Sequence, residues 1–282
     1  MSRFSNSFHV YLAIFLLSCG GLFAKWIILP STLTIWVRCL MAVPLFFIIC
    51  KSLSYSLIIQ KRHILPLFIS GVGLMIHWVG FFESIQLSNV ATGVVLYITF
   101  PFFTTLLEPF FSKKKLSISS LIEGLVIIGG VYLISYQAGL TFSSFYVYFW
   151  GLSSALGFSI RNLISKYYLY SYSTFTLMFF QLLIIVLLLS SEITTIHTIP
   201  YSEWLKLIIL VIGFTVISHT LYLHMVSSFS VTTVSLLTGL EPVISIILSW
   251  LIFGEIPSLF IYLGGIPILA VVVYESFRLK RL

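Results

Sequence analysis

The chain alternates long apolar runs with short polar stretches, and this pattern predicts its architecture. About 20 apolar residues in a helix are enough to cross the hydrocarbon core of a bilayer. Hydrocarbon offers no hydrogen-bond partners, so each run is predicted to be a helix, which satisfies its own backbone. Ten such segments are expected: Phe8–Ile28, Thr32–Cys50, Ile64–Leu87, Val90–Phe111, Ile118–Gln137, Phe145–Ser165, Phe175–Leu189, Trp204–Val226, Val231–Phe253 and Leu259–Ser276.

The composition indicates an all-α integral membrane protein. Hydrophobic residues make up 59% of the chain and charged residues 8%, whereas soluble proteins are about 25% charged. The mean hydropathy is +1.12. All eight acidic residues are Glu, which excludes mechanisms that need an Asp dyad or an Asp-rich metal loop. Cys19, Cys39 and Cys50 lack metal-binding spacing and are expected to be small buried hydrophobes. No cofactor or metal is predicted.

The placement of Lys and Arg predicts the orientation of the chain. Cytoplasmic loops carry an excess of these residues, and ten helices put both termini on one side. One side has only Lys25 and Lys206. The opposite side has eleven: Arg3, Lys51, Lys61, Arg62, Lys113, Lys114, Lys115, Lys166, Arg278, Lys280 and Arg281. Both termini are therefore expected in the cytoplasm, and the net charge of +7 reflects these loops, with no nucleic acid as a partner.

A shift of 141 residues reveals an internal repeat. The shift superimposes Ser18 on Ser159, Lys25 on Lys166, Thr92 on Thr233, Pro101 on Pro242 and Gly124 on Gly265. The proposed units are 8–137 and 145–276, with five helices each. Because five is odd, the two units must have opposite orientations in the membrane. Inverted repeats of this kind are typical of secondary transporters.

With these features the sequence resembles the EamA branch of the drug/metabolite transporter (DMT) superfamily. The matching pieces are LEPVISIILSWLIFGE in the ninth segment with its partner in the fourth, TIWVRCLMAVP in the second, IHWVGFFESIQLS in the third and GGVYL in the fifth. The likeness covers the whole chain as two EamA repeats. The spacing E-P-x(12)-E from Glu241 to Glu255 is fairly specific for the family, but not for a substrate.

The resemblance implies a ten-helix transporter and not an enzyme. Segments 3, 4, 8 and 9 would surround a central cavity, segments 1, 2, 6 and 7 would close its sides, and segments 5 and 10 would be peripheral. The first repeat departs from the family pattern, because SKKKL (residues 112–116) stands where many members have a Gly-Glu pair like Gly254-Glu255. This departure argues against a symmetric role for the terminal Glu of each repeat.

The pair Glu241-Pro242, near the middle of the ninth segment, is the main candidate for a functional site. A carboxyl group in hydrocarbon is costly and by default is read as functional. Pro242 lacks an N–H and so leaves the carbonyl of Thr238 without its helical partner. Thr238, Glu241 and Ser245 share one helical face. The alternatives are a structural kink with a neutral Glu241, and packing for Ser245. Pro101 is the equivalent proline, and it frees the carbonyl of Tyr97.

The other candidates are single polar or aromatic residues inside predicted helices. Arg38 needs a partner, for which Glu241 and Glu83 are available; it could also hold a substrate carboxylate or form a structural ion pair. His77 and His219 could relay protons or could be hydrogen-bonded packing residues. The shift places His219 at the position of Trp78, so the two histidines are expected at comparable depth. Trp78, Phe81, Phe82 and Tyr97 are candidates for a cavity wall.

The remaining charged and small residues are given structural roles. Arg161 is expected to extend toward the cytoplasm. Glu108, Glu123 and Glu255 are expected to be solvated at the interface or, for the first two, paired with Lys113–Lys115. Close helix contacts are expected at Gly71 with Gly73, and at Gly151, Ala155 and Ser159.

The favoured function is a secondary transporter that moves a small organic metabolite, amino-acid-like or otherwise amphipathic, across the cell membrane by alternating access. The expected partners are the lipid bilayer and the substrate, with protons as a candidate coupling ion. Alternatives on the same fold are a lipid or lipid-precursor translocase and a multidrug exporter. An intramembrane hydrolase would need Ser159 and His219 as nucleophile and base. Without a phosphate loop or an HExxH motif, neither an ATP-driven pump nor a metalloprotease is supported. The substrate, the direction of transport and the oligomeric state stay open.

Overall fold

A computed structural model describes residues 3–111, 118–138, 142–221 and 241–278. Helix is found in each of the ten predicted segments wherever the structure describes them. The longer helices are α1 Arg3–Trp26, α2 Ser31–Ser52, α3 Ile64–Gln86, α4 Val90–Tyr97, α5 Phe100–Phe111, α6 Ile118–Ala138, α7 Phe142–Tyr168, α8 Thr174–Leu188, α9 Tyr201–Val211, α12 Glu241–Phe253 and α13 Leu259–Arg278. A π-helix, η4 (Ile212–Ile217), continues α9, and short 3-10 turns occupy Lys61–His63, Ser190–Thr194 and Ile196–Thr198. Thr238 lies outside the described residues.

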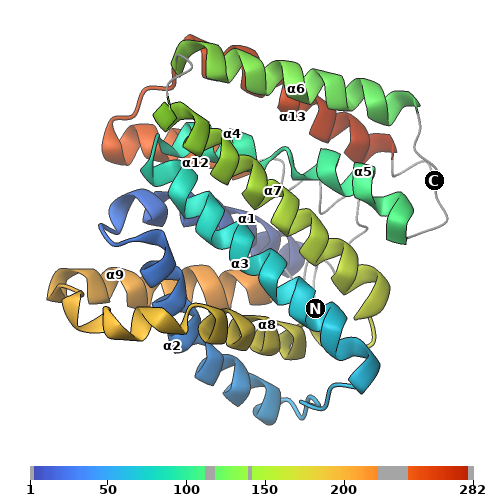
Figure 1. Ribbon diagram of the computed structural model, residues 1–282, viewed down its shortest axis with the longest axis vertical. Helices are drawn as coiled ribbons and strands as arrows, with labels where there is room; N and C mark the ends of the chain where they lie inside the picture. Colours follow the sequence, from blue (N-terminus) through green and yellow to red (C-terminus); the bar gives the residue numbers. More distant parts are fainter. Residues whose placement is uncertain (1–2, 112–117, 139–141, 222–240, 279–282) are drawn as a thin grey trace.

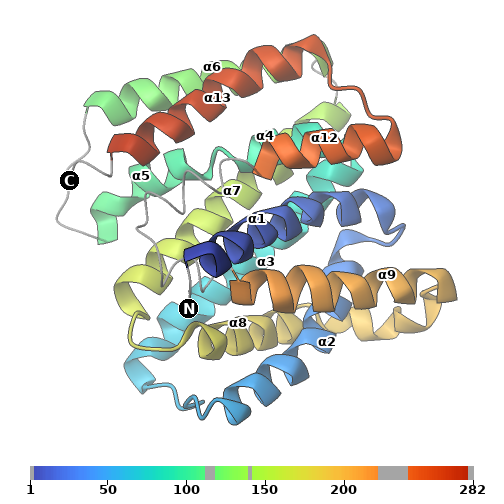
Figure 2. The same cartoon turned by 180° about the vertical axis from the view of Figure 1, so that it is seen from behind.

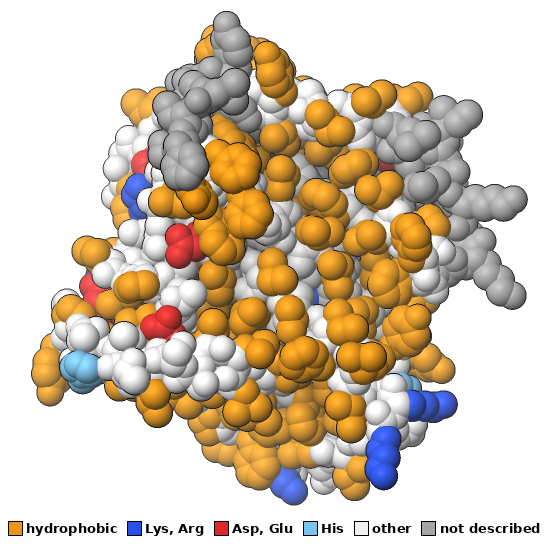
Figure 3. All heavy atoms as spheres, in the orientation of Figure 1, with side chains coloured by type: hydrophobic (Ala, Val, Ile, Leu, Met, Phe, Trp, Pro, Cys, Tyr) orange, Lys and Arg blue, Asp and Glu red, His pale blue; other side chains and the backbone are white. Residues whose placement is uncertain are grey.

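Several of these helices have the length and hydropathy of membrane spans. Among the described residues four qualify: Ser31–Ser52, Lys61–Gln86, Val90–Phe111 and Tyr201–Leu221. Shorter apolar helices make up the rest of the bundle. Figure 3 shows one face of the molecule, on which hydrophobic side chains cover most of the surface and charged side chains gather mainly toward its margins. Exposed apolar side chains on this scale fit a protein surrounded by lipid.

Local sequence signals explain where some helices begin and end. The side chain of Asn89 accepts a hydrogen bond of 2.8 Å from the backbone N–H of Thr92 and caps the start of α4. Ser173 caps α8 in the same way through the N–H of Thr176. Short polar side chains at these positions satisfy N–H groups that the helix leaves unpaired. Gly254, directly after α12, has φ of +68°, which glycine adopts without strain.

The sequence predicts one apolar segment with a helix-breaking proline at residue 101, and the structure divides this segment into two helices. Helix α4 ends at Tyr97 and α5 begins at Phe100. Between them the chain makes tighter turns, because the N–H of Thr99 bonds the carbonyl of Leu96 and the N–H of Phe102 bonds that of Thr99. Residue 101 is proline and cannot bond the carbonyl of Tyr97. The break therefore falls where the proline predicts it.

Helices α3 and α7 form the central crossing of the bundle (Figure 1) and join the two repeats. A Cβ on Gly73 would lie 2.8 Å from the carbonyl oxygen of Gly157, and a Cβ on Gly157 would lie 2.6 Å from that of Gly73. The two backbones can approach this closely only because both residues are glycine. The contact predicted for Gly73 is thus confirmed. Gly151 likewise packs against Leu96.

The arrangement of the helices displays the inverted repeat. In Figures 1 and 2, α1 and α7, which are the first helices of the two units, run in opposite directions across the molecule. Helices α6 and α13, the last of each unit, pack together at one edge. A Cβ added to Gly130 of α6 would lie 2.6 Å from the carbonyl oxygen of Gly264 in α13.

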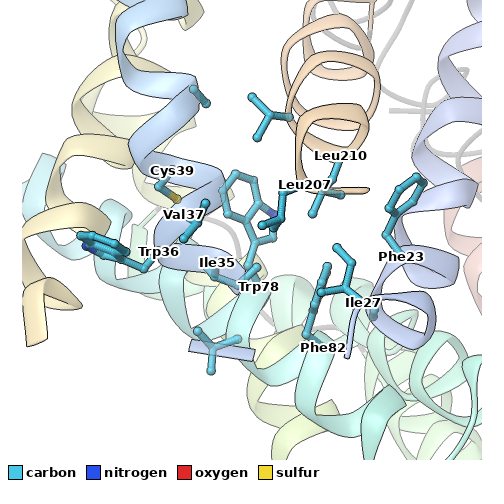
Figure 4. Packing of buried hydrophobic residues seen from close by; sticks show 14 of the residues in the cluster. Phe23, Ile27, Ile35, Trp36, Val37, Cys39, Trp78, Phe82, Leu207 and Leu210 are labelled. Carbon is cyan, nitrogen blue, oxygen red and sulfur yellow. The ribbon is translucent and has the colours of Figure 1, made fainter. Parts of the chain in front are cut away.

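The largest apolar core lies among α1, α2, α3, α8 and α9. Figure 4 shows part of it, with Trp78 between Val37 and Leu207 and with Phe23 on the neighbouring α1. A smaller core joins α4 to the pair α6–α13. All three cysteines are buried, as predicted.

Candidate functional site

Five aromatic rings from four helices form a continuous cluster in the interior, which we call the aromatic cluster. It consists of His77 and Phe81 from α3, Tyr97 from α4, Phe100 from α5 and Phe158 from α7. The ring of His77 lies 4.9 Å from that of Tyr97 and 4.6 Å from that of Phe158. Tyr97 in turn stacks on Phe100 at 5.4 Å. The break between α4 and α5 places these last two rings together at the point where the helix is interrupted.

The sequence predicts part of this cluster. His77, Phe81 and Tyr97 are candidates from the sequence, and the structure brings them together. Phe158 was missed, because nothing in the sequence distinguishes it from the other 25 phenylalanines. Its ring contacts three members of the cluster, with centroid distances of 4.6 to 5.5 Å.

His77 is held by the opposite helix. Its side chain is 7% exposed, and its Nδ1 lies 2.9 Å from the hydroxyl oxygen of Ser154 in α7. The hydroxyl can donate to Nδ1 or accept from it, depending on which ring nitrogen carries the proton. The contact fixes the ring plane beside Tyr97 and Phe158.

Arg38, in α2, has no carboxylate partner among the described residues. The sequence suggests Glu241 or Glu83, and the structure corrects this expectation. The Nε of Arg38 donates to the hydroxyl of Thr215 at 2.7 Å, and its Nη2 donates to the carbonyl oxygen of Phe214 at 3.2 Å. The side chain is 5% exposed, and both of these acceptors are neutral.

The π-helix η4 explains why a backbone carbonyl is available to Arg38. The N–H of Ser218 bonds the carbonyl of Gly213, five residues earlier. In an α-helix this N–H would bond the carbonyl of Phe214, four residues earlier. The π turn thus releases the Phe214 carbonyl, and Arg38 takes it. Single π turns occur frequently at functional sites, and the sequence gives no signal for this one.

Trp78 connects Arg38 to His219. The guanidinium carbon of Arg38 lies 4.0 Å from the centroid of the Trp78 ring. The centroid of the His219 ring lies 5.9 Å from that of the same Trp78 ring. The sequence places His219 and Trp78 at equivalent positions of the repeat, and the structure brings their rings into contact. We call Arg38, Trp78, Thr215 and His219 the arginine group.

The residues of the ninth segment are only partly described. Glu241 is the first residue of α12 and is half-buried. No hydrogen bond or ion pair joins it to another described residue. Pro242 is buried in the first turn of α12. The hydroxyl of Ser245 donates to the carbonyl of Ser18 in α1 at 2.7 Å, so Ser245 contributes to helix packing, the alternative that the sequence left open.

Three charged residues occupy environments that the sequence does not predict. Arg161 is 8% exposed, and both its Nε and its Nη2 lie 3.3 Å from the side-chain oxygen of Gln181, so it does not extend to the cytoplasm. Glu123 is 7% exposed and lines a groove between α6 and α13, so its side chain is largely shielded from solvent. Glu108 pairs with Lys166, and the lysines predicted as its partners lie outside the described residues.

Ser159 and His219 do not form a nucleophile–base pair. The hydroxyl oxygen of Ser159 lies 2.7 Å from the carbonyl oxygen of Phe100 and 2.9 Å from that of Ala155, while the ring of His219 packs on Trp78. Ser159 therefore ties α7 to the start of α5, as a packing residue does. In the described part of the chain, no group of three His, Cys or Glu residues is arranged to hold a metal.

Comparisons with known proteins agree with the architecture. The sequence profile of the EamA-like transporter family matches residues 7–136 and again residues 145–275. The chain is 27% identical over 258 residues to an uncharacterized transporter, YxxF, of Bacillus subtilis (strain 168), covering 89% of this chain and 82% of the relative. One solved crystal structure superimposes with a TM-score of 0.63 at 19% identity and covers 99% of this chain and all of the other. At this identity the likeness shows a shared fold.

Proposed function

Because the chain belongs to the EamA-like transporter family, whose members are multi-pass membrane proteins and not enzymes, we propose that it is a secondary transporter working by alternating access. The proposed cargo is a small amphipathic solute that carries a carboxylate. Its binding site is proposed between the aromatic cluster and the arginine group. The two units, 8–137 and 145–276, would move relative to each other around this site.

The observation that carries the proposal is the buried charge of Arg38. A guanidinium has five N–H donors, and contacts with described residues use two of them, both on neutral acceptors. Burying a cation without a counter-charge costs several kcal/mol. A carboxylate can accept two parallel hydrogen bonds from a guanidinium and would supply the missing charge.

The aromatic cluster supports an apolar body for the same solute. Small-molecule sites in proteins combine apolar and aromatic walls with a few fixed polar groups. His77 and Trp78 are adjacent in α3, and Trp78 carries the stacked guanidinium. One helix thus contributes to both the aromatic cluster and the arginine group.

Glu241 is proposed as the coupling residue. It lies half-buried at the start of α12, in a segment where a charged carboxyl is costly. Transport would be driven by a proton gradient or by the gradient of the solute itself. If the Glu241→Gln variant transports with unchanged pH dependence in proteoliposomes, Glu241 does not couple protons.

Both termini are proposed to be cytoplasmic. The support is the distribution of Lys and Arg, eleven on the side of the termini and two on the other. Arginine and lysine in short loops set membrane orientation.

Thermal unfolding of the purified protein with matched probes tests the carboxylate site. Phenylacetate carries an aromatic ring and a carboxylate, and phenylacetamide differs only in lacking the charge. A ligand present at 100 times its dissociation constant stabilises the native state by about 2.7 kcal/mol. We expect phenylacetate, but not phenylacetamide, to stabilise the protein. The Arg38→Ala variant should lose this response. The control Arg62→Ala, which removes an exposed arginine, should keep it.

The outcomes separate the candidate functions. Equal stabilisation by acid and amide, or a response that survives in Arg38→Ala, would contradict the proposed role of Arg38. A response only to lipids or to cationic amphiphiles would favour the second candidate, a lipid translocase or multidrug exporter. One feature favours that candidate: a mainly apolar groove of about 330 Å³ between α5 and α7, lined by Phe103, Phe145, Tyr148, Phe149, Leu152, Ser153 and Leu156.

A further inference from the structure

We propose that two ion pairs related by the internal repeat, Lys25–Glu255 and Lys166–Glu108, are latches that close the two sides of the transport path. The inference rests on the proposed alternating-access function. It goes beyond that function because it assigns the closing contacts to four side chains outside the binding site.

The first latch joins the end of α1 to the turn after α12. The ammonium of Lys25 lies 3.2 Å from Glu255 Oε1. The other oxygen, Oε2, accepts from the hydroxyl of Ser249 at 2.6 Å and from the backbone N–H of Val90, the first residue of α4, at 3.2 Å. Glu255 therefore connects the second unit to two helices of the first.

The second latch joins the end of α7 to the end of α5. The ammonium of Lys166 lies 3.3 Å from Glu108 Oε1. The hydroxyl of the adjacent Tyr167 donates to the same oxygen at 2.6 Å. This latch also connects the two units, since α5 belongs to the first and α7 to the second.

The internal repeat relates the two latches. A shift of 141 residues superimposes Lys25 on Lys166 and the fourth segment on the ninth. Glu108 falls on Ser249, whose hydroxyl bonds Glu255. Each latch thus pairs the lysine near the end of a unit's first helix with a carboxylate near the end of the other unit's fourth helix. In Figure 1 the end of α1 and the α12–α13 turn lie at the left, and the ends of α5 and α7 lie at the right.

The exposure of these side chains suits contacts that open and close. The side chains of Lys25 and Glu255 are 35% and 19% exposed, and those of Lys166 and Glu108 are 58% and 18% exposed. Water can solvate partly exposed charges when they separate, so such pairs contribute little net stability. Movement of one unit against the other has to break one latch to open that side. Both latches are formed in this structure.

The Lys25 side carries a second ion pair, between Lys206 and Glu203. Lys206 lies 2.7 Å from Glu203 and donates to the carbonyl of Trp26 at 2.9 Å. The other oxygen of Glu203 accepts from the N–H of Ile28 at 3.2 Å. Shifted back by 141 residues, Glu203 and Lys206 fall on Arg62 and Leu65, which cannot form this pair.

Sidedness of cysteine labelling tests the latches. The reporter is Phe81→Cys in a background with Cys19, Cys39 and Cys50 changed to Ala. Right-side-out and inside-out vesicles are treated with a membrane-impermeant maleimide. Lys25→Glu should raise labelling from the Lys25 side about fivefold, which is roughly 1 kcal/mol, and Glu108→Lys should do the same from the opposite side. The double reversals Lys25→Glu/Glu255→Lys and Lys166→Glu/Glu108→Lys should restore wild-type rates.

The exposed control Lys61→Glu should change neither labelling rate. If a single reversal does not fold, Lys25→Gln or Glu108→Gln replaces it, since these remove the attraction without adding repulsion. Unchanged rates in every variant, with the reporter labelled from one side, would overturn the latches and leave the transporter proposal intact. A reporter that is never labelled from either side would instead contradict the proposed transport path, and the latches with it.

Discussion

The guanidinium carbon of Arg38 in α2 lies 4.0 Å from the centre of the Trp78 ring in α3. Stacking on an aromatic face and donating to Thr215 and Phe214 fixes the plane of the guanidinium. Donors on its remaining edge thus have a defined direction before any solute arrives. A site organised in advance loses less entropy on binding.

Thr215 should position Arg38 for binding. Thr215→Val removes the acceptor of the Arg38 Nε, so we expect the affinity for phenylacetate to fall while stability falls by only about 1 kcal/mol. Ligand-dependent unfolding measures both. Thr220→Val is the matched control, because the Thr220 hydroxyl donates to the carbonyl of Val216 in its own helix. Equal effects of the two variants on affinity would contradict a positioning role.

The glycines at the α3–α7 crossing should not tolerate a methyl group. Gly73→Ala or Gly157→Ala places a Cβ within 3 Å of a backbone oxygen, and overpacking of this kind costs about 1–3 kcal/mol. Unfolding in detergent measures the loss. Gly129→Ala, in α6, is the control, because no atom lies within 4 Å of its added Cβ and alanine favours helix. A stable Gly73→Ala protein would mean that the two helices can separate at no cost.

The Glu203–Lys206 pair should couple more strongly than the Lys166–Glu108 pair. The side chains of the first pair are 5% and 15% exposed, so Glu203→Gln leaves a half-buried ammonium without its counter-charge. Double-mutant cycles with Lys206→Met should give a coupling of about 1 kcal/mol or more. The same cycle with Glu108→Gln and Lys166→Met should give a smaller value, because that lysine is 58% exposed. The reverse order would show that burial does not govern these pairs.

Removing the helix break should impair binding without unfolding the protein. Pro101→Ala supplies a backbone N–H four residues after Tyr97, where proline has none, and it removes a residue that disfavours helix interiors by about 3 kcal/mol. We expect equal or higher thermal stability and a weaker response to phenylacetate, because α4 and α5 would join and move Tyr97 and Phe100. Pro44→Ala, at an exposed position inside α2, is the control and should leave the response intact. If Pro101→Ala responds to phenylacetate as strongly as the wild type does, the break between α4 and α5 is not needed for binding.

The sequence by itself determined the helices, the internal repeat and the position of the break in the fourth segment. These features depend on local chemistry. Apolar runs of this length have to satisfy their own backbone, proline lacks an N–H wherever it occurs, and an odd number of helices inverts the second unit. Small residues at Gly73 and Gly157 permit close approach for the same local reason. Three members of the aromatic cluster, His77, Phe81 and Tyr97, were also identified from the sequence.

Only the tertiary structure decided which side chains meet. Arg38 and Thr215 are 177 residues apart in the chain, and their contact depends on a π turn that releases one carbonyl. Arg161 donates a hydrogen bond to Gln181. Lys25 forms an ion pair with Glu255, which lies 230 positions later in the sequence. Hydropathy places a residue in the membrane but does not give the rotation of its helix or the neighbour it faces. The partners of buried charges follow from helix packing, and packing is set by all the helices together.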